Sequence, residues 1–282
     1  MRFEQAVIPL APRQVSHCLD LAFVFLRQHV RPLAALWGTV AIPTCGLVYF
    51  LVDRYEYTIQ TALIAWYVAS SPLGVLLIAG SAPSAFGEPF TWRGTMARLR
   101  ATGWSLVLLA WVWRLLILIS APFLLFPGWY LAVRKGFLVE QKVLSRLAGH
   151  LHDRRTNELL KGEIGDLCLR SFWIMAFSVL LWVSLMVTID FASTYLLGLP
   201  ILWGRMQIDL TYLDGVFKAM GYVVDFLWND PAVVTLALAA GLMAYVPARL
   251  AWFFCYIDVR VRRDCWDMEL EIVREAERLE AT

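Results

Sequence analysis

The chain has 282 residues, of which 60% are apolar and 17% are charged, whereas soluble globular domains carry about 45–50% apolar and about 25% charged residues. The mean hydropathy of +0.61 excludes a disordered chain, because disorder requires low hydrophobicity and high net charge. A net charge of +2 gives no broad electric field that would recruit nucleic acid. The composition therefore predicts an all-α integral membrane protein without a nucleic-acid partner.

Residues 1–31 form the first predicted segment. Between Gln14 and Val30, apolar side chains alternate with Asp20, Arg27 and Gln28 at helical spacing. Such a helix is too charged to cross a bilayer and too apolar to leave its surface. We therefore expect an N-terminal amphipathic interfacial helix on the inner leaflet.

A membrane domain of six crossings is predicted for residues 32–256, because a helix needs about 20 apolar residues to cross the hydrocarbon core. Four spans are read directly from apolar runs, and they lie at 32–52, 57–79, 172–189 and 231–254. The second of these is expected to end before the Ser-Ala-Pro-Ser sequence at 81–84, which we interpret as its exit from the membrane.

The remaining two crossings are predicted as a hairpin with arms at 103–126 and 129–145. Its apolar sequence contains one charge, Arg114, and is interrupted by Pro127-Gly128, a dipeptide that marks turns. The second arm is the shorter one, and the sequence leaves open whether both arms cross the bilayer completely.

Most of the 25 lysines and arginines lie in four clusters: before residue 32, at 93–100, at 134–170 and from 249 onwards. Cytoplasmic loops collect such residues, and six crossings place all four clusters on one side. Both termini are therefore expected in the cytoplasm. Lysine is rare among the basic residues, which suggests a GC-rich bacterial genome and hence a bacterial inner membrane.

Residues 257–282 are predicted to continue the last span as a cytoplasmic helix. Apolar residues recur there every three or four positions, as in a helical stripe; they are Ile257, Val261, Cys265, Met268, Ile272, Ala276 and Leu279. Ile272 and Leu279 are candidate contacts for a protein partner. Ala240, Ala244 and Ala248 form a face of small residues, which in membranes favours close packing against another span or a second copy of the chain.

The sequence contains no recognisable catalytic or cofactor-binding motif. His150 and His152 are the closest histidine pair, but two such residues on a helix point about 200° apart. The five cysteines show neither metal spacing nor a disulfide framework. We therefore expect a non-enzymatic protein without cofactor or metal.

Arg114 is the strongest candidate for an intramembrane polar site, because a charge at mid-span costs about 2.5–3.5 kcal/mol. One interpretation is a structural clamp, with Asp190 or carbonyl groups near Pro122 as partner, and the other is an anion or lipid-phosphate site. Arg134 and Lys135 lie in the second arm, just before Gly136. They are either lipid head-group ligands or ordinary flanking charges.

The tail sequence CYIDVRVRRDCWDMELEI resembles the end of the last membrane helix in the bacterial group related to the membrane domain of glycerophosphodiester phosphodiesterases. The residues that match this pattern are Tyr256, Asp258, Arg260, Arg262, Asp264 and Asp267. The run at 127–134 is similar to the mid-chain hairpin of that group. This sequence contains no phosphodiesterase barrel, so the resemblance implies a membrane domain without the hydrolytic activity.

Two functions remain as hypotheses. The first is a non-enzymatic subunit or scaffold of a bacterial inner-membrane assembly, which contacts membrane lipids and a protein partner. The alternative is a small transporter or lipid-handling protein, in which Arg114 and the broken hairpin line a pathway, as broken helices do in transporters.

Overall fold

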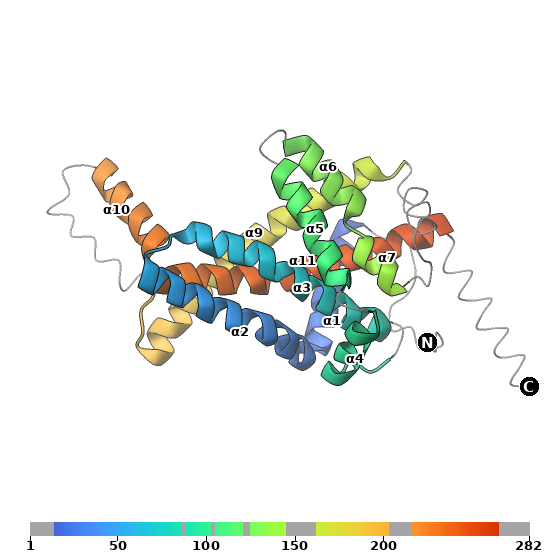
Figure 1. The fold of residues 1–282 in the computed structure, drawn as a ribbon, viewed down its shortest axis with the longest axis horizontal. Helices are drawn as coiled ribbons and strands as arrows, with labels where there is room; N and C mark the ends of the chain where they lie inside the picture. The colour runs from blue at the N-terminus through green and yellow to red at the C-terminus, as the bar shows by residue number, and fades with distance from the viewer. Residues whose placement is uncertain are drawn as a thin grey trace, which may run out of the picture. The chain divides into compact units, whose positions relative to one another are not determined.

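The structure, a computed structural model, describes residues 14–85, 88–102, 105–120, 125–144, 162–202 and 216–264. These residues form ten α-helices and no β-strand (Figure 1). The helices are α1 (Val15–Gln28), α2 (Val30–Tyr55), α3 (Ile59–Ala85), α4 (Trp92–Thr102), α5 (Ser105–Ser120), α6 (Leu125–Lys135), α7 (Leu138–Leu144), α9 (Ile164–Leu197), α10 (Val216–Asn229) and α11 (Pro231–Asp264).

Four helices, α2, α3, α9 and α11, are long and apolar enough to cross a membrane. Each contains one of the four apolar runs, apart from the first two residues of the run at 57–79. The helices α4 and α5 meet at 80° and pass the same test only as a bent pair. The described residues therefore give four or five candidate spans, where the sequence predicted six.

The predicted hairpin is present as α5 and α6, which pack against each other (Figure 1), but its helices are short. With 16 and 11 residues and a rise of about 1.5 Å per residue, they extend about 24 and 16 Å. The hydrocarbon core is about 30 Å thick. Pro127 and Gly128 lie in the first turn of α6, because a proline there loses no intrahelical hydrogen bond.

Helix α3 continues through the Ser-Ala-Pro-Ser sequence that was expected to mark its exit. Ser81 and Ser84 donate hydrogen bonds to the carbonyl oxygens of Leu77 and Gly80, at 2.7 and 3.0 Å. Serine hydroxyls that bond back to the preceding turn satisfy themselves within the helix. Polar residues at this point therefore do not end the helix. The predicted end at residue 79 was wrong, because α3 continues to Ala85.

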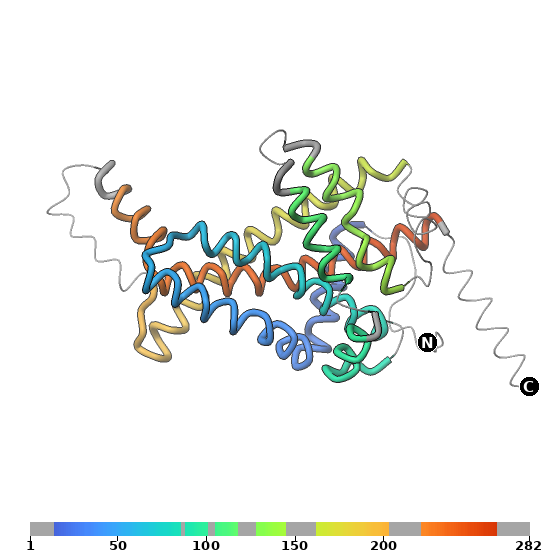
Figure 2. Tube along the Cα trace, in the orientation of Figure 1, coloured from blue at the N-terminus to red at the C-terminus, as the bar shows by residue number. Residues whose placement is uncertain are grey.

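The chain divides into two compact units, and α2, α3, α9 and α11 each contribute to both. Unit 1 consists of residues 1–36, 71–176 and 246–282. Its described part contains α1, α4, α5, α6 and α7, which are coloured blue and green in Figure 2. One apolar core of this unit joins α6, α9 and α11 through Val133, Phe137, Leu167, Tyr256 and Val259.

Unit 2 consists of residues 37–70 and 177–245. Ala240 and Ala244 of the small-residue face are buried there. A Cβ atom on Gly241 would lie 3.2 Å from Trp66 and 3.8 Å from Trp182, and the indole of Trp182 donates to the carbonyl oxygen of Ala237 at 2.9 Å. This part of the face thus packs against indoles of α3 and α9 in the same chain.

Candidate functional site on the last helix

The C-terminal part of α11 carries a buried ionic cluster with the start of α9. Arg170 donates from Nη1 to Asp258 at 2.6 Å and from Nε to Asp166 at 2.7 Å. Arg262 also donates to Asp258. Only 5% of the Arg170 side chain and 1% of the Asp258 side chain are exposed. Buried charges require such pairing, so this cluster fixes the register of α9 against α11.

A second face of α11 receives the junction between α6 and α7. Phe137 stacks on Trp252 with ring centroids 4.8 Å apart, and its centroid is 5.3 Å from that of Tyr256. A Cβ atom on Gly136 would lie 2.9 Å from the indole nitrogen of Trp252. Only a glycine therefore allows this close approach of the junction to α11.

Glu140, on α7, completes this contact with a buried ion pair. Its Oε1 atom lies 2.7 Å from Nη1 of Arg249, and the Glu140 side chain is completely buried. Among the described residues, no hydrogen-bond donor reaches Oε2. Burial raises the pKa of the Glu140 carboxyl, and the charge of Arg249 opposes this effect only in part.

Helix α1 packs on α11 beside these contacts. The rings of Phe25 and Phe254 meet edge to face with centroids 6.1 Å apart. Cys18 of α1 and Cys255 of α11 are fully buried. The same part of α11 thus holds α1, the α6–α7 junction and α9.

The described residues of the tail motif pack or form ion pairs within the chain itself. Tyr256 and Asp258 are buried, Arg260 is 7% exposed, and Arg262 binds Asp258. Asp264 is the last residue of α11. Asp267, Ile272 and Leu279 lie outside the described residues, as do His150 and His152.

The sequence-predicted lipid candidates lie on the α5–α6 hairpin. Arg114 is half-buried on α5, and Arg134 and Lys135 are half-buried at the end of α6. The ammonium group of Lys135 lies over the ring of Trp113, 4.7 Å from its centroid. This cation–π contact brings the two arms of the hairpin together next to Arg114.

Asp190, the partner suggested for Arg114, caps the turn that follows α9. Its Oδ1 atom accepts hydrogen bonds from the backbone N–H groups of Ile201 and Leu202, at 3.1 and 2.7 Å. Asp190 is 1% exposed. Asp190 thus has a structural role in unit 2 that the sequence did not indicate.

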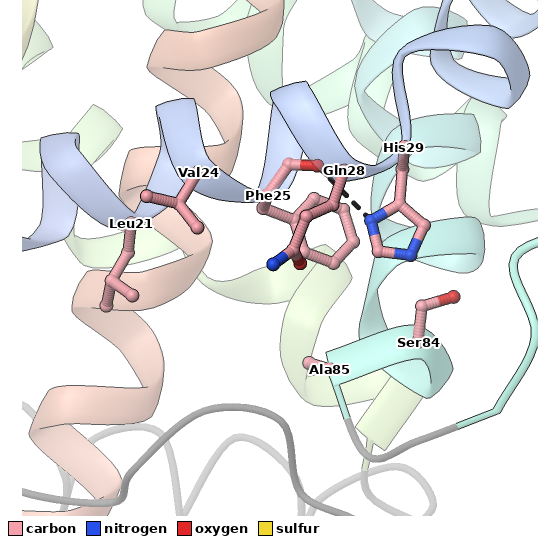
Figure 3. A pocket seen from close by; sticks show the side chains of 7 residues that line it. All are labelled: Leu21, Val24, Phe25, Gln28, His29, Ser84 and Ala85. Atoms are coloured by element: carbon pink, nitrogen blue, oxygen red, sulfur yellow. Dashed lines mark hydrogen bonds between the residues drawn. The ribbon is translucent and has the colours of Figure 1, made fainter.

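A small cavity of about 50 Å³ lies between α1 and the end of α3 (Figure 3). Its lining residues are Leu21, Val24, Phe25, Gln28, His29, Ser84 and Ala85. Nδ1 of His29 is 3.2 Å from the carbonyl oxygen of Phe25. The volume suits a few water molecules and not an organic substrate.

Sequence reasoning missed Glu140, Arg170 and Arg249 as a set. Glu140 and Arg170 lie in mixed-charge stretches that are typical of a solvated loop, and the partners of all three residues are far away in the chain. The one available signal was Arg249, which follows directly on the apolar run of α11.

Within the described ranges, no group of three or more histidine, cysteine, aspartate or glutamate residues could hold a metal ion. Comparisons with protein-family models, with curated proteins and with solved structures gave no match to this chain.

Proposed function

We propose that the chain is a non-enzymatic subunit or scaffold of a bacterial inner-membrane assembly, and that α9 carries the contact with its partner. The observation behind this proposal is the low burial of α9. Only 6% of its most apolar window is buried, compared with 61% for α3 and 56% for α11. Between residues 171 and 189 of α9 only Ile174 is buried, and the others are half-buried or exposed, so part of the surface of this helix is available to lipid or to another helix.

The chemistry of the exposed surface favours another helix. Ser184, Thr188 and Ala192 are exposed and follow one another at intervals of four residues. The Thr188 hydroxyl donates a hydrogen bond to the carbonyl oxygen of Ser184 at 2.7 Å. Its proton therefore needs no acceptor on a neighbouring helix. Small residues at this spacing let helices approach closely in a membrane.

The ionic contacts of α11 support a scaffold. Glu140, Asp166 and Arg170 bind residues of α11, and these contacts join helices of the chain to one another. A helix of 34 residues extends about 51 Å and exceeds the hydrocarbon core by about 20 Å. Such an anchored helix can carry a partner outside the membrane.

The topology proposed with this function has four crossings, α2, α3, α9 and α11, and both termini in the cytoplasm. The α5–α6 hairpin enters the inner leaflet and returns to the same side. This arrangement keeps all four basic clusters in the cytoplasm, as six crossings would, because the hairpin begins and ends on the same side in both cases.

The test replaces the three small residues of α9 with a larger one. The triple substitution Ser184→Leu, Thr188→Leu and Ala192→Leu should release the partner, whether this is a second copy or another protein. The measured mass of the complex, extracted from the membrane with its lipids by an amphipathic polymer, should therefore fall. Gly46→Leu on α2 is the matched control, because Gly46 is exposed and its Cβ would meet open space. An unchanged mass in the triple variant, or an equal loss in the control, would overturn the proposal.

The second candidate function, lipid handling or transport around Arg114, is favoured by the contact of Lys135 with Trp113, which draws a cation towards Arg114. Native mass spectrometry distinguishes a lipid site at Arg114 from a structural clamp. A lipid site requires that Arg114→Leu lose anionic lipid without a change in melting temperature, and that Arg114→Lys, which lacks the bidentate fork, retain part of it. Equal lipid binding by all three proteins would leave the clamp.

A further inference from the structure

Two short amphipathic helices of unit 1, α1 and α4, meet through Phe90. The ring of Phe90 lies 6.3 Å from that of Phe25 and 5.6 Å from that of His29, measured between centroids. A Cβ atom on Gly80 would come within 2.1 Å of the Phe90 ring. Phe90 is therefore held against α3, and it holds the end of α1 next to the start of α4.

The surface around this junction carries four exposed arginines, which we call the exposed arginine group. They are Arg27 at the end of α1, Arg31 at the start of α2, and Arg93 and Arg100 on α4. Arg93 and Arg100 are seven residues apart and thus share one face of the helix, while Thr95 and Leu99 form its buried face.

These arginines differ in their ion pairing from five other arginines of unit 1. Arg98, Arg170, Arg249, Arg262 and Arg263 each have a carboxylate partner within the chain. No member of the exposed arginine group has an acidic partner in the described ranges. Exposed positive charges without a carboxylate partner among the described residues require an anionic surface or counter-ions from solution.

The apolar residues beside them indicate which anionic surface this is. Phe23, Val24 and Val30 are 38%, 50% and 53% exposed, and they lie within four residues of Arg27. Helix α4 meets the apolar helix α5 at 80°, so it lies across the direction of the helix that enters the lipid. Exposed apolar and basic side chains together on such helices are typical of binding in the head-group region of a membrane.

We propose that the exposed arginine group binds the phosphates of anionic phospholipids in the leaflet from which α5 enters the membrane. The guanidinium groups contact the phosphates, while Phe23, Val24 and Val30 reach the acyl boundary. This inference does not depend on the contact proposed for α9, because it concerns other helices and another ligand.

The experiment compares retention of phosphatidylglycerol and phosphatidylcholine by the full chain, by native mass spectrometry from nanodiscs that contain equal amounts of both. The wild type should retain phosphatidylglycerol preferentially, and the preference should decline with salt as the charges are screened. The quadruple change of Arg27, Arg31, Arg93 and Arg100 to Gln should weaken the preference about fivefold per arginine, since each basic residue near a lipid surface contributes about 1 kcal/mol.

Two controls separate lipid binding from folding and from general charge. Arg54→Gln removes an exposed arginine from the end of α2 in unit 2 and should leave the preference unchanged. The quadruple change to Lys should keep most of it, because the charge remains. Equal retention of the two lipids by the wild type, or an undiminished preference in the Gln variant, would overturn the proposal. If the Gln variant fails to fold, the Lys variant and the salt dependence of the wild type decide. A preference for phosphatidylglycerol that does not change with salt would then overturn the proposal.

Discussion

Arg170 on α9 and Asp258 on α11 are joined by a hydrogen bond of 2.6 Å between residues 88 positions apart in the chain. Both side chains are withdrawn from solvent. A charged pair in such surroundings is maintained by mutual neutralisation, and removal of one partner leaves the other as a buried charge.

Arg170→Leu is therefore expected to lower the free energy of unfolding by about 3 kcal/mol, the low end for a broken buried pair, because Arg262 still contacts Asp258. Thermal and denaturant unfolding in mild detergent would measure the change. Arg98→Leu provides the comparison, since Arg98 and Glu88 form a pair that is 36% and 31% exposed, and such a pair contributes less than about 1 kcal/mol. Similar losses in the two variants would contradict the assignment of Arg170 to a buried network.

Glu140 predicts a pH dependence of α7 packing. Because burial raises the pKa of its carboxyl in the folded state above the ordinary value of about 4.3, the folded state binds this proton more tightly than the unfolded state does. Its stabilising contribution is complete below the ordinary pKa and is lost as the pH rises through the raised pKa. Hydrogen exchange of residues 138–144, corrected for the intrinsic rate, should therefore slow on acidification from neutral pH.

The variant Glu140→Gln imitates the protonated carboxyl without titrating. It should keep the slow exchange of the acidic state at every pH, with Arg249 as the charged group that faces it. Faster exchange of the wild type in acid, or the same pH dependence in the variant, would exclude Glu140 as the titrating group.

Gly136 and Gly165 predict opposite effects of the same added methyl group. In Gly136→Ala the new Cβ would lie 2.8 Å from the carbonyl oxygen of Ala132 and 2.9 Å from Trp252, so a loss of about 1–3 kcal/mol is expected from overpacking. In Gly165→Ala, within α9, the Cβ meets open space. Because Ala favours a helix over Gly by about 1 kcal/mol, this variant should be equally or more stable. The melting temperatures of the two variants would test this contrast.

The proposed re-entrant topology of the hairpin predicts that Ser120, at the end of α5, is not accessible from outside the cell. A Ser120→Cys variant without the native cysteines should resist an impermeant maleimide, while Arg54→Cys should react with it. Arg98→Cys and Glu163→Cys should react only after the cytoplasmic side is opened. External labelling of Ser120→Cys would instead support six complete crossings.

The sequence was sufficient for the long spans because the length of an apolar run is a local property. It was misleading at Ser81 and Ser84, where the hydroxyls bond within the helix and a polar tetrapeptide reads as an exit. The sequence predicted that the stretch at 103–145 divides into two arms, but it did not give the lengths of α5 and α6, which are 16 and 11 residues. Pro127 and Gly128, which were expected to form the turn, lie in the first turn of α6.

The candidate site was less accessible to sequence reasoning for a different reason. Arg114 can be recognised from its apolar neighbours in the sequence, but Glu140 and Arg249 are notable only because they form an ion pair with each other. A local sequence pattern cannot predict a contact between segments so far apart. The tail motif was found, yet its buried members Tyr256 and Asp258 face the chain's own helices, and only the packing distinguishes this from an interface.

The position of α11 in the chain has a consequence for biosynthesis. Glu140 and Arg170 are synthesised before Arg249 and Asp258, the residues of α11 that neutralise them. Until α11 arrives, these charges must remain in water or with the insertion machinery, because burial without a partner costs several kcal/mol. Translation that stops before residue 249 should therefore yield an incompletely assembled product that quality-control proteases remove, even though α2, α3 and α9, three of the four long apolar helices, have already been made.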